Sequence, residues 1–276
     1  MSRIQRNSIY QSNQLKVLFS FTTSLMACFL TCVLFFSGCQ QNEPPPTPEN
    51  AAAVQEELQG IRGLIEAGNF QEAFLRLNGA LDIDPKNPKI HLNLAWLYLY
   101  TKDMQKALQE ISTLRKLSPD LPEIDHLQGV FDQNQAQQLQ QNGQPLVGEQ
   151  LHKQAVFRLQ KALNHDKNNH QIFFDIATSL SAIDRNQEAL SFLDSGFDYI
   201  PTADLETQVN FQIAICALHA KMNMFEEAIL DCEQAATFAN TDAAKERIVN
   251  LIENMKLLNP GFELPENAKK LDALQP

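Results

Sequence analysis

The sequence is poor in glycine, and this scarcity excludes several classes of functional site. Its 276 residues contain ten glycines, and none of them forms a Gly-rich phosphate-binding loop or the Gly-x-Ser-x-Gly elbow of a hydrolase. No two histidines enclose a glutamate at zincin spacing, and His165 and His170 lie in a polar turn without a third metal ligand at fixed spacing. We therefore predict no catalytic residue, no metal and no cofactor, so the protein is not expected to be an enzyme.

Sustained alternation of apolar and polar residues is also missing, so no strand is predicted. Positive charge is scarce, because 22 Lys and Arg stand against 33 Asp and Glu. No nucleic-acid partner is expected for a chain of net charge −11. Apolar residues instead recur at helical spacing from Ala51 to Leu258, which predicts an all-α fold.

The first 38 residues predict an export signal rather than part of the fold. They carry three cations and no acid, and residues 17–36 form an uncharged apolar run. A run of this length also spans a bilayer, so an uncleaved membrane helix is the competing interpretation. Because the cations precede the run, both interpretations place the rest of the chain outside the cytoplasm.

The apolar run ends in Phe36-Ser37-Gly38-Cys39, which resembles the lipobox of bacterial lipoproteins, although Phe36 replaces the usual leucine. The resemblance implies cleavage before Cys39, lipid attachment to Cys39 and anchoring of the mature chain to a membrane of the cell envelope. By that family's sorting rule, Gln40 after the cysteine favours the outer membrane. Residues 39–50, rich in proline and glutamine, predict a tether of roughly 30 Å at about 3.1 Å per residue.

Two cysteines, Cys216 and Cys232, remain in the part of the chain that is expected to fold. Both lie in apolar helical surroundings. They are either packed thiols or a disulfide that an oxidising compartment permits, and the sequence leaves both interpretations open.

Helical hairpins recur at a spacing of 34 residues, as between Ala73 and Ala107. The clearest unit, residues 88–121, has a first helix that is apolar on two sides, a polar turn at residues 101–103 and an amphipathic second helix. A helix that is apolar on two sides needs neighbours on both of them. We therefore expect the hairpins to stack.

These units resemble tetratricopeptide repeats. In residues 88–121, the residues that match the family pattern are Leu94, Ala95, Tyr98, Ala107 and Pro119. His91 stands in place of the family's tryptophan and Ile111 in place of its phenylalanine. The resemblance implies an α-solenoid of about five hairpins over residues 51–258. The repeats are expected at residues 54–87, 88–121, 122–169, 170–203 and 209–242, with a C-terminal capping helix at 242–258 and a tail at 259–276.

Three features depart from a regular array. Gly60 and Gly63 are expected to break the first helix of the first repeat. The third repeat carries about fourteen extra residues in the Gln-rich segment 133–150. This segment is either a longer first helix with a solvated loop at residues 142–145, or a loop that reaches over one face and contacts a partner. The tail after the capping helix is expected to be mobile or to lie on the surface.

In tetratricopeptide arrays the first helices line a concave groove that takes peptides or helices, so the resemblance implies a protein or peptide partner. The expected groove residues are Leu58, Arg62, Leu92, Trp96, Leu99, Tyr100, His126, Val130 and Phe174. Trp96, with Tyr100 one turn later, is a candidate anchor for a partner side chain. Alternatively, Trp96 packs inside the array. If it is an anchor, replacing both aromatic residues by alanine should weaken partner capture without unfolding the array.

Together these features predict a lipid-anchored scaffold of the cell envelope that binds proteins through its groove. The alternatives are an assembly factor for a pilus, secretin or secretion apparatus, an accessory subunit of a cell-wall enzyme, and a membrane-spanning repeat protein with an uncleaved N-terminal helix. The family's Lys- and Asn-based clamp for chaperone C-termini is missing, because Leu58 and Arg62 stand where it would begin.

Overall fold

The computed structural model describes residues 47–202, 204–259 and 271. The expected export signal, the proposed lipid attachment site Cys39 and most of the tether lie outside these residues. All regular structure in the described part of the chain is helical. None of the helices in that part is both long enough and apolar enough to cross a membrane.

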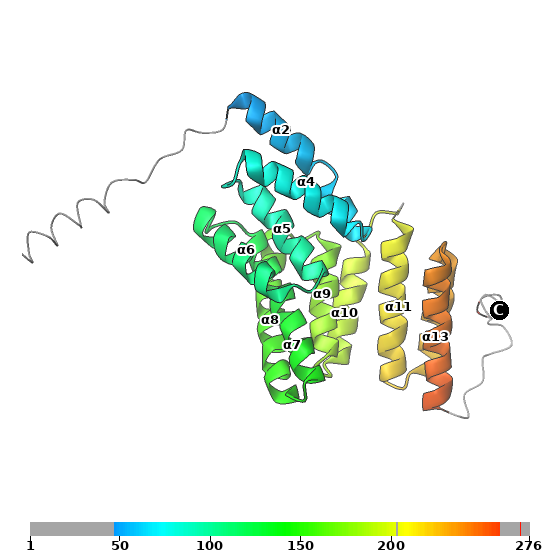
Figure 1. The fold of residues 1–276 in the computed structure, drawn as a ribbon. Helices are drawn as coiled ribbons and strands as arrows, with labels where there is room; N and C mark the ends of the chain where they lie inside the picture. The colour runs from blue at the N-terminus through cyan, green and yellow to red at the C-terminus, as the bar shows by residue number, and fades with distance from the viewer. Residues whose placement is uncertain (1–46, 203, 260–270, 272–276) are drawn as a thin grey trace, which may run out of the picture. The chain divides into compact units, whose positions relative to one another are not determined.

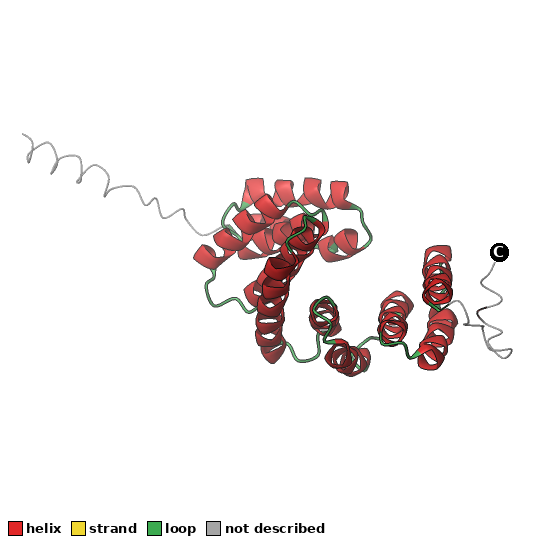
Figure 2. Cartoon of the chain, turned by 90° about the horizontal axis from the view of Figure 1, so that it is seen from below, coloured by secondary structure: helices red, strands yellow, loops and turns green. Residues whose placement is uncertain are grey.

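The helices form consecutive hairpins within one compact unit, Pro48–Pro276. In chain order they are α2 (Pro48–Leu58) and α3 (Ile61–Glu66) with α4 (Phe70–Ile83), α5 (Pro88–Tyr100) with α6 (Met104–Leu117), α7 (Glu123–Gln141) with α8 (Pro145–His165), α9 (His170–Ser181) with α10 (Asn186–Phe197), α11 (Leu205–Lys221) with α12 (Phe225–Phe238), and α13 (Asp242–Leu258). Figure 1 shows the hairpins following one another from α2 in blue to α13 in orange. Figure 2 shows from below that short loops join the helices. The predicted all-α solenoid of about five hairpins with a capping helix is confirmed.

Small residues allow the two helices of each hairpin to approach closely. One alanine at the equivalent position of each second helix is completely buried, namely Ala73, Ala107, Ala155, Ala189 and Ala228. Ala95, Ala177 and Cys216 are buried at the predicted contact positions of their first helices. Larger side chains in such packed contacts typically cost about 1–3 kcal/mol, so these positions determine how closely the two helices of a hairpin pack.

Side chains cap the N-termini of five helices in the described part of the chain, α5, α6, α9, α11 and α13. Asp103 accepts a hydrogen bond from the backbone N–H of Lys106 at 3.2 Å, directly after Lys102 has turned the chain with a positive φ of 59°. Thr241 accepts one from the N–H of Ala244 at 3.2 Å and so caps α13. Each cap satisfies a backbone donor that has no partner within its own helix.

The first helix of the first repeat is interrupted once rather than twice. Gly60, with φ of 73°, separates α2 from α3, a conformation that glycine adopts without steric cost. Gly63 lies inside α3, so the prediction of a second break there is wrong. Helix α2 begins at Pro48, so residues 48–50 are helical rather than part of the tether.

The extra residues of the third repeat form helix rather than a long loop. Helix α8 begins ten residues before its buried alanine, whereas α4, α6, α10 and α12 each begin three residues before theirs. Helix α7 is extended by a similar length, so both arms project about 10 Å further at about 1.5 Å per residue. Only residues 142–144 form the turn. Of the two alternatives for this segment, the structure therefore favours the longer first helix with a short loop, and it lengthens the second helix as well.

A disulfide joins Cys216 in α11 to Cys232 in α12, with the two Cα atoms 5.6 Å apart. Both residues are completely buried. The structure thus favours the second of the two interpretations that the sequence left open for these cysteines.

The C-terminal core includes a residue from the expected tail. Leu271 is fully buried in a cluster with Ile248, Ile252 and Met255 of α13. At this residue the chain is part of the core, contrary to the expectation of a mobile or surface tail. The other tail residues after Asn259, and the side chain of Leu258, lie outside the described part.

Candidate interaction groove

One position in each first helix defines the groove. It follows directly after the small or buried residue that contacts the second helix, and in chain order it holds Arg62, Trp96, Val130, Thr178 and Ala217. From Trp96 onward the side chain at this position becomes smaller in every repeat. The same backbone position is therefore filled early in the array and nearly empty late in it.

One pocket of the groove, the aromatic pocket, lies between α5, α7 and α9 and has a volume of about 240 Å³. Its lining residues are Trp96, Leu99, Tyr100, Lys102, Val130, Gln133, Asn134, Gln171 and Asp175. Four of them, Trp96, Leu99, Tyr100 and Val130, are expected groove residues. Three consecutive first helices thus contribute to one hollow.

Trp96 forms the floor of this pocket, and its side chain is only 5% exposed. The guanidinium carbon of Arg62 lies 4.6 Å from the centre of its ring, and the ring of His126 meets it edge-on at 4.8 Å between centroids. These contacts are a cation–π and an aromatic pair. Trp96 therefore packs inside the array, and it is not available as the exposed anchor that one interpretation of the sequence expected.

A buried polar bridge links α7 to α9 beside Trp96. His126 Nε2 lies 2.7 Å from Asp175 Oδ2, and Gln171 Nε2 donates to Asp175 Oδ1 at 3.0 Å. The two oxygens of Asp175 are thus both engaged. Because such a network is costly to disrupt in a low-dielectric site, it holds the shape of the pocket.

The rim of the aromatic pocket is polar and accessible. Tyr100 is 39% exposed, and its partial burial raises the pKa of the phenol, so the hydroxyl stays neutral near pH 7. Half-buried Gln133, Asn134 and Gln171 add side-chain amides. The buried Oε1 of Gln133 has no hydrogen-bond partner in the described structure. A side-chain amide offers both a hydrogen-bond donor and an acceptor, which suits the N–H and C=O groups of a peptide backbone.

The remaining expected groove residues lie outside the pocket. Leu58 and Leu92 are half-buried against the N-terminal core cluster. Phe174 packs on Phe211, with ring centroids 5.2 Å apart. Of the nine expected groove residues, four therefore line the aromatic pocket, and Arg62 and His126 pack against one of these four, Trp96. Leu58, Leu92 and Phe174 lie apart from the pocket.

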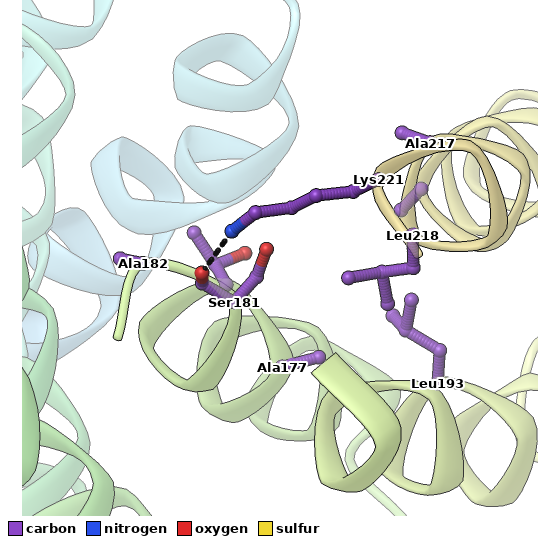
Figure 3. A pocket seen from close by; sticks show the side chains of 9 residues that line it. Ala177, Ser181, Ala182, Leu193, Ala217, Leu218 and Lys221 are labelled. Atoms are coloured by element: carbon purple, nitrogen blue, oxygen red, sulfur yellow. Dashed lines mark hydrogen bonds between the residues drawn. The ribbon is translucent and has the colours of Figure 1, made fainter. Parts of the chain in front are cut away.

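The second pocket, the alanine pocket, lies between α9, α10 and α11 and is larger, at about 360 Å³. Its lining residues are Ala177, Thr178, Ser181, Ala182, Leu193, Ala214, Ala217, Leu218 and Lys221. Figure 3 shows Lys221 reaching from α11 to the end of α9, where its ammonium donates to the Ser181 carbonyl at 2.6 Å. The same ammonium pairs with Asp184 at 2.8 Å and lowers the pKa of that carboxyl group.

Sequence reasoning missed the alanine pocket. Thr178 and Ala217 occupy the same repeat position as Trp96, so counting along the repeats reaches them. A search for large anchor residues passes over alanine, however, because a pocket is formed where side chains are small. In the described residues no group of three or more His, Cys, Asp or Glu side chains is placed to hold a metal ion.

Comparisons with known proteins agree with this architecture. A family model described as the tetratricopeptide repeat matches residues 64–130. A thermophilic TPR protein of Thermus thermophilus has a similar structure, with a TM-score of 0.61, 17% identity and coverage of 72% of this chain and 99% of that chain. Pseudomonas aeruginosa PilF is similar with a TM-score of 0.52, 15% identity and coverage of 82% and 97%. No curated protein sequence matches this chain. The family model thus identifies tetratricopeptide repeats at residues 64–130, and the two solved structures share the fold of the larger array.

Proposed function

We propose that this chain is a scaffold of the bacterial cell envelope, anchored by a lipid on Cys39, whose aromatic pocket binds a segment of a protein partner. A tetratricopeptide repeat domain is in general a protein-binding fold. The observation that carries the proposal is the rim of the aromatic pocket, where Tyr100, Asn134 and Gln171 from three first helices surround one hollow. We assign no catalytic role to it.

The chemistry of the rim suits a peptide better than a purely apolar ligand. The side-chain amides offer donors and acceptors to backbone groups, and Tyr100 offers an amphipathic ring, a residue type that is enriched at binding hot spots. Trp96, the floor of the pocket, is held in place by the edge-on ring of His126, which reduces the ordering that binding requires. A preorganised floor with an adaptable polar rim is the arrangement expected of a peptide-binding groove.

Two observations support the envelope location. The N-terminal cations, apolar run and Cys39 resemble a lipoprotein leader. Independently, the folded domain contains the Cys216–Cys232 disulfide, and disulfides persist mainly in oxidising compartments outside the cytoplasm. The acidic net charge of −11 accords with a protein partner rather than nucleic acid.

The groove is tested with a photo-crosslinking amino acid at position 100 of the full-length chain in its native cells. We expect one envelope protein to be crosslinked from Tyr100 and not from Gln109, an exposed control on α6. The identity of that protein also separates a general scaffold from a pilus or secretion assembly factor or a cell-wall enzyme subunit. Equal crosslinking from both positions would contradict a specific groove.

The anchor is tested by mass spectrometry of the N-terminal peptide. We expect an acylated Cys39 at the N-terminus of the mature wild-type protein. The Cys39→Ser variant should give no acylated mature form. A retained Met1 would rule out the lipoprotein and support the membrane-spanning alternative.

A further inference from the structure

The tip of the α7–α8 hairpin, residues 142–147, exposes apolar side chains that nothing in the described chain covers. Leu146 and Val147, the second and third residues of α8, are 76% and 51% exposed. The insertion carries them about 10 Å further than the arms of a regular hairpin, at about 1.5 Å per helical residue. The alanine pocket is likewise open, with a volume of about 360 Å³. One copy of the chain thus leaves both an apolar projection and an apolar hollow facing water.

The tip lies in the longest uncharged stretch of the repeat domain. Residues 133–148 contain no Asp, Glu, Lys or Arg, and no longer uncharged run occurs in residues 48–259. The chain as a whole carries a net charge of −11, so two copies repel one another over much of their surface. An uncharged tip contacts a second copy without adding to this charge repulsion.

The alanine pocket suits an uncharged occupant. Its single cation, Lys221, is already matched by Asp184 and by the carbonyl of Ser181, as Figure 3 shows for the latter. An acidic ligand would have to compete with Asp184 for this ammonium, whereas an aliphatic side chain needs no counter-charge. The pocket and the tip therefore match in charge as well as in polarity.

The tip and the pocket lie at the same end of their hairpins. Helices α7, α9 and α11 are all first helices and run in the same direction, so their C-terminal ends lie together (Figure 1). Ser181 and Lys221, the last residues of α9 and α11, bring the pocket to this end. A two-fold axis between two copies makes any contact reciprocal, so each copy can give one tip and receive one.

We propose that the chain forms a two-fold dimer in which Leu146 and Val147 of each copy insert into the alanine pocket of the other. The pocket volume of about 360 Å³ is more than twice that of the roughly 150 Å³ apolar cavity that takes up benzene, so it has room for two aliphatic side chains. The contact is closed, because each copy gives one tip and receives one. It leaves the aromatic pocket, on the α7 side of α9, to the partner.

The test is disulfide trapping in cells between two differently tagged full-length copies. One copy carries Leu146→Cys and the other Ala182→Cys, which lies at the pocket away from the native disulfide. We expect a mixed dimer on a non-reducing gel, at least tenfold above that of the matched control pair, Phe157→Cys with Ala182→Cys. Phe157 is 71% exposed on the same helix but lies away from the tip.

A pocket-filling change separates specific insertion from chance collision. Adding Ala217→Phe to the Ala182→Cys copy is expected to lower the yield of the mixed dimer at least tenfold, while its thermal unfolding confirms that the copy is folded. No mixed dimer, or equal yields from position 146 and position 157, overturns the proposal. Capture of a different envelope protein by a photo-crosslinker at position 182, in place of the chain itself, also overturns it. Crosslinking from Tyr100 is unaffected by any of these outcomes, so the proposed function is judged separately.

Discussion

The two pockets occupy equivalent places between neighbouring first helices, yet they are built in opposite ways. In the aromatic pocket the repeat position that faces the groove holds Trp96, which Arg62 and His126 enclose. In the alanine pocket the same position holds Ala217, and the space in front of it remains open. At the aromatic pocket the large side chain therefore packs within the chain and stabilises the fold, whereas the alanine pocket leaves room for an incoming side chain.

The difference shows that a large aromatic residue in a repeat groove is not by itself a binding anchor. Trp96 contributes to folding because Arg62 lies over its ring and the ring of His126 meets it edge-on. The accessible chemistry of the aromatic pocket is at its rim, at Tyr100 and the side-chain amides. In the alanine pocket the accessible surface is the floor itself.

The largest effect is expected from removing the floor of the aromatic pocket. Trp96→Ala should lower the free energy of unfolding by about 3–5 kcal/mol, as for other buried aromatic residues. The expectation that Trp96 can be removed together with Tyr100 without unfolding the array is therefore abandoned. Urea denaturation followed by circular dichroism measures the loss. Tyr100→Ala, the half-exposed control, should cost much less, and equal losses would show that the two aromatic residues are not distinguished by burial.

The second effect concerns the hairpin that forms one wall of the alanine pocket. The double variant Cys216→Ala and Cys232→Ala removes the covalent link between α11 and α12 and should cost about 2–4 kcal/mol. Its urea midpoint should fall below that of the oxidised wild type. Adding dithiothreitol should lower the midpoint of the wild type and leave that of the double variant unchanged. A wild type that is insensitive to reductant would contradict a stabilising link.

The sequence predicted the repeat architecture because the spacing of small residues and helix ends is a local pattern. Ala73 and Ala107 are buried as expected, and so is Ala95. The pairing of Cys216 with Cys232 was not predictable in this way, since it depends on how closely α11 and α12 approach. For the insertion, the alternative of a longer first helix agrees with α7, but the matching extension of α8 was not predicted. An antiparallel hairpin accommodates extra residues without a long loop when both arms lengthen together.

The candidate site was predicted less well than the fold, for a physical reason. The repeat register predicts Trp96 and Val130 on the groove side, and both line the aromatic pocket, but the exposure of a side chain depends on what neighbouring helices contribute. Arg62 lies 34 residues before Trp96, and His126 comes from the next first helix; both cover the indole. Such enclosure is a property of the assembled helices and cannot be read from one repeat alone.

A third experiment compares two alanines that differ only in their surroundings. Ala95→Leu adds volume in a completely buried helix contact and should cost about 1–3 kcal/mol. Ala217→Leu adds the same atoms at the alanine pocket and should change stability by less than about 0.5 kcal/mol, as at a surface position. Thermal unfolding of the two single variants gives the comparison directly. Equal destabilisation would mean that the alanine pocket is not open in solution.

The smallest expected effect is a pH dependence of folding stability in the early part of the array, at His91. His91 Nδ1 lies 2.6 Å from the Glu110 carboxylate and Nε2 lies 2.9 Å from the Pro85 carbonyl. Both partners are acceptors, so the ring is best satisfied when both nitrogens are protonated. The hydrogen bond with Glu110, the largest cause, raises the pKa of His91 above its ordinary value of 6.5 against the opposing effect of burial.

A raised folded-state pKa stabilises the fold fully at pH values below the unfolded pKa, and the stabilisation is lost as pH rises through the folded pKa. Glu110→Gln removes the charged acceptor, so the stability advantage of the wild type over this variant should be largest near pH 6 and smaller near pH 8.5. Urea midpoints at the two pH values measure it. Tyr100→Ala, at the aromatic pocket, serves as the control whose difference from the wild type should be the same at both. An advantage that grows with pH would mean that His91 is neutral in the folded chain, because the charged pair would then contribute nothing to stability at low pH.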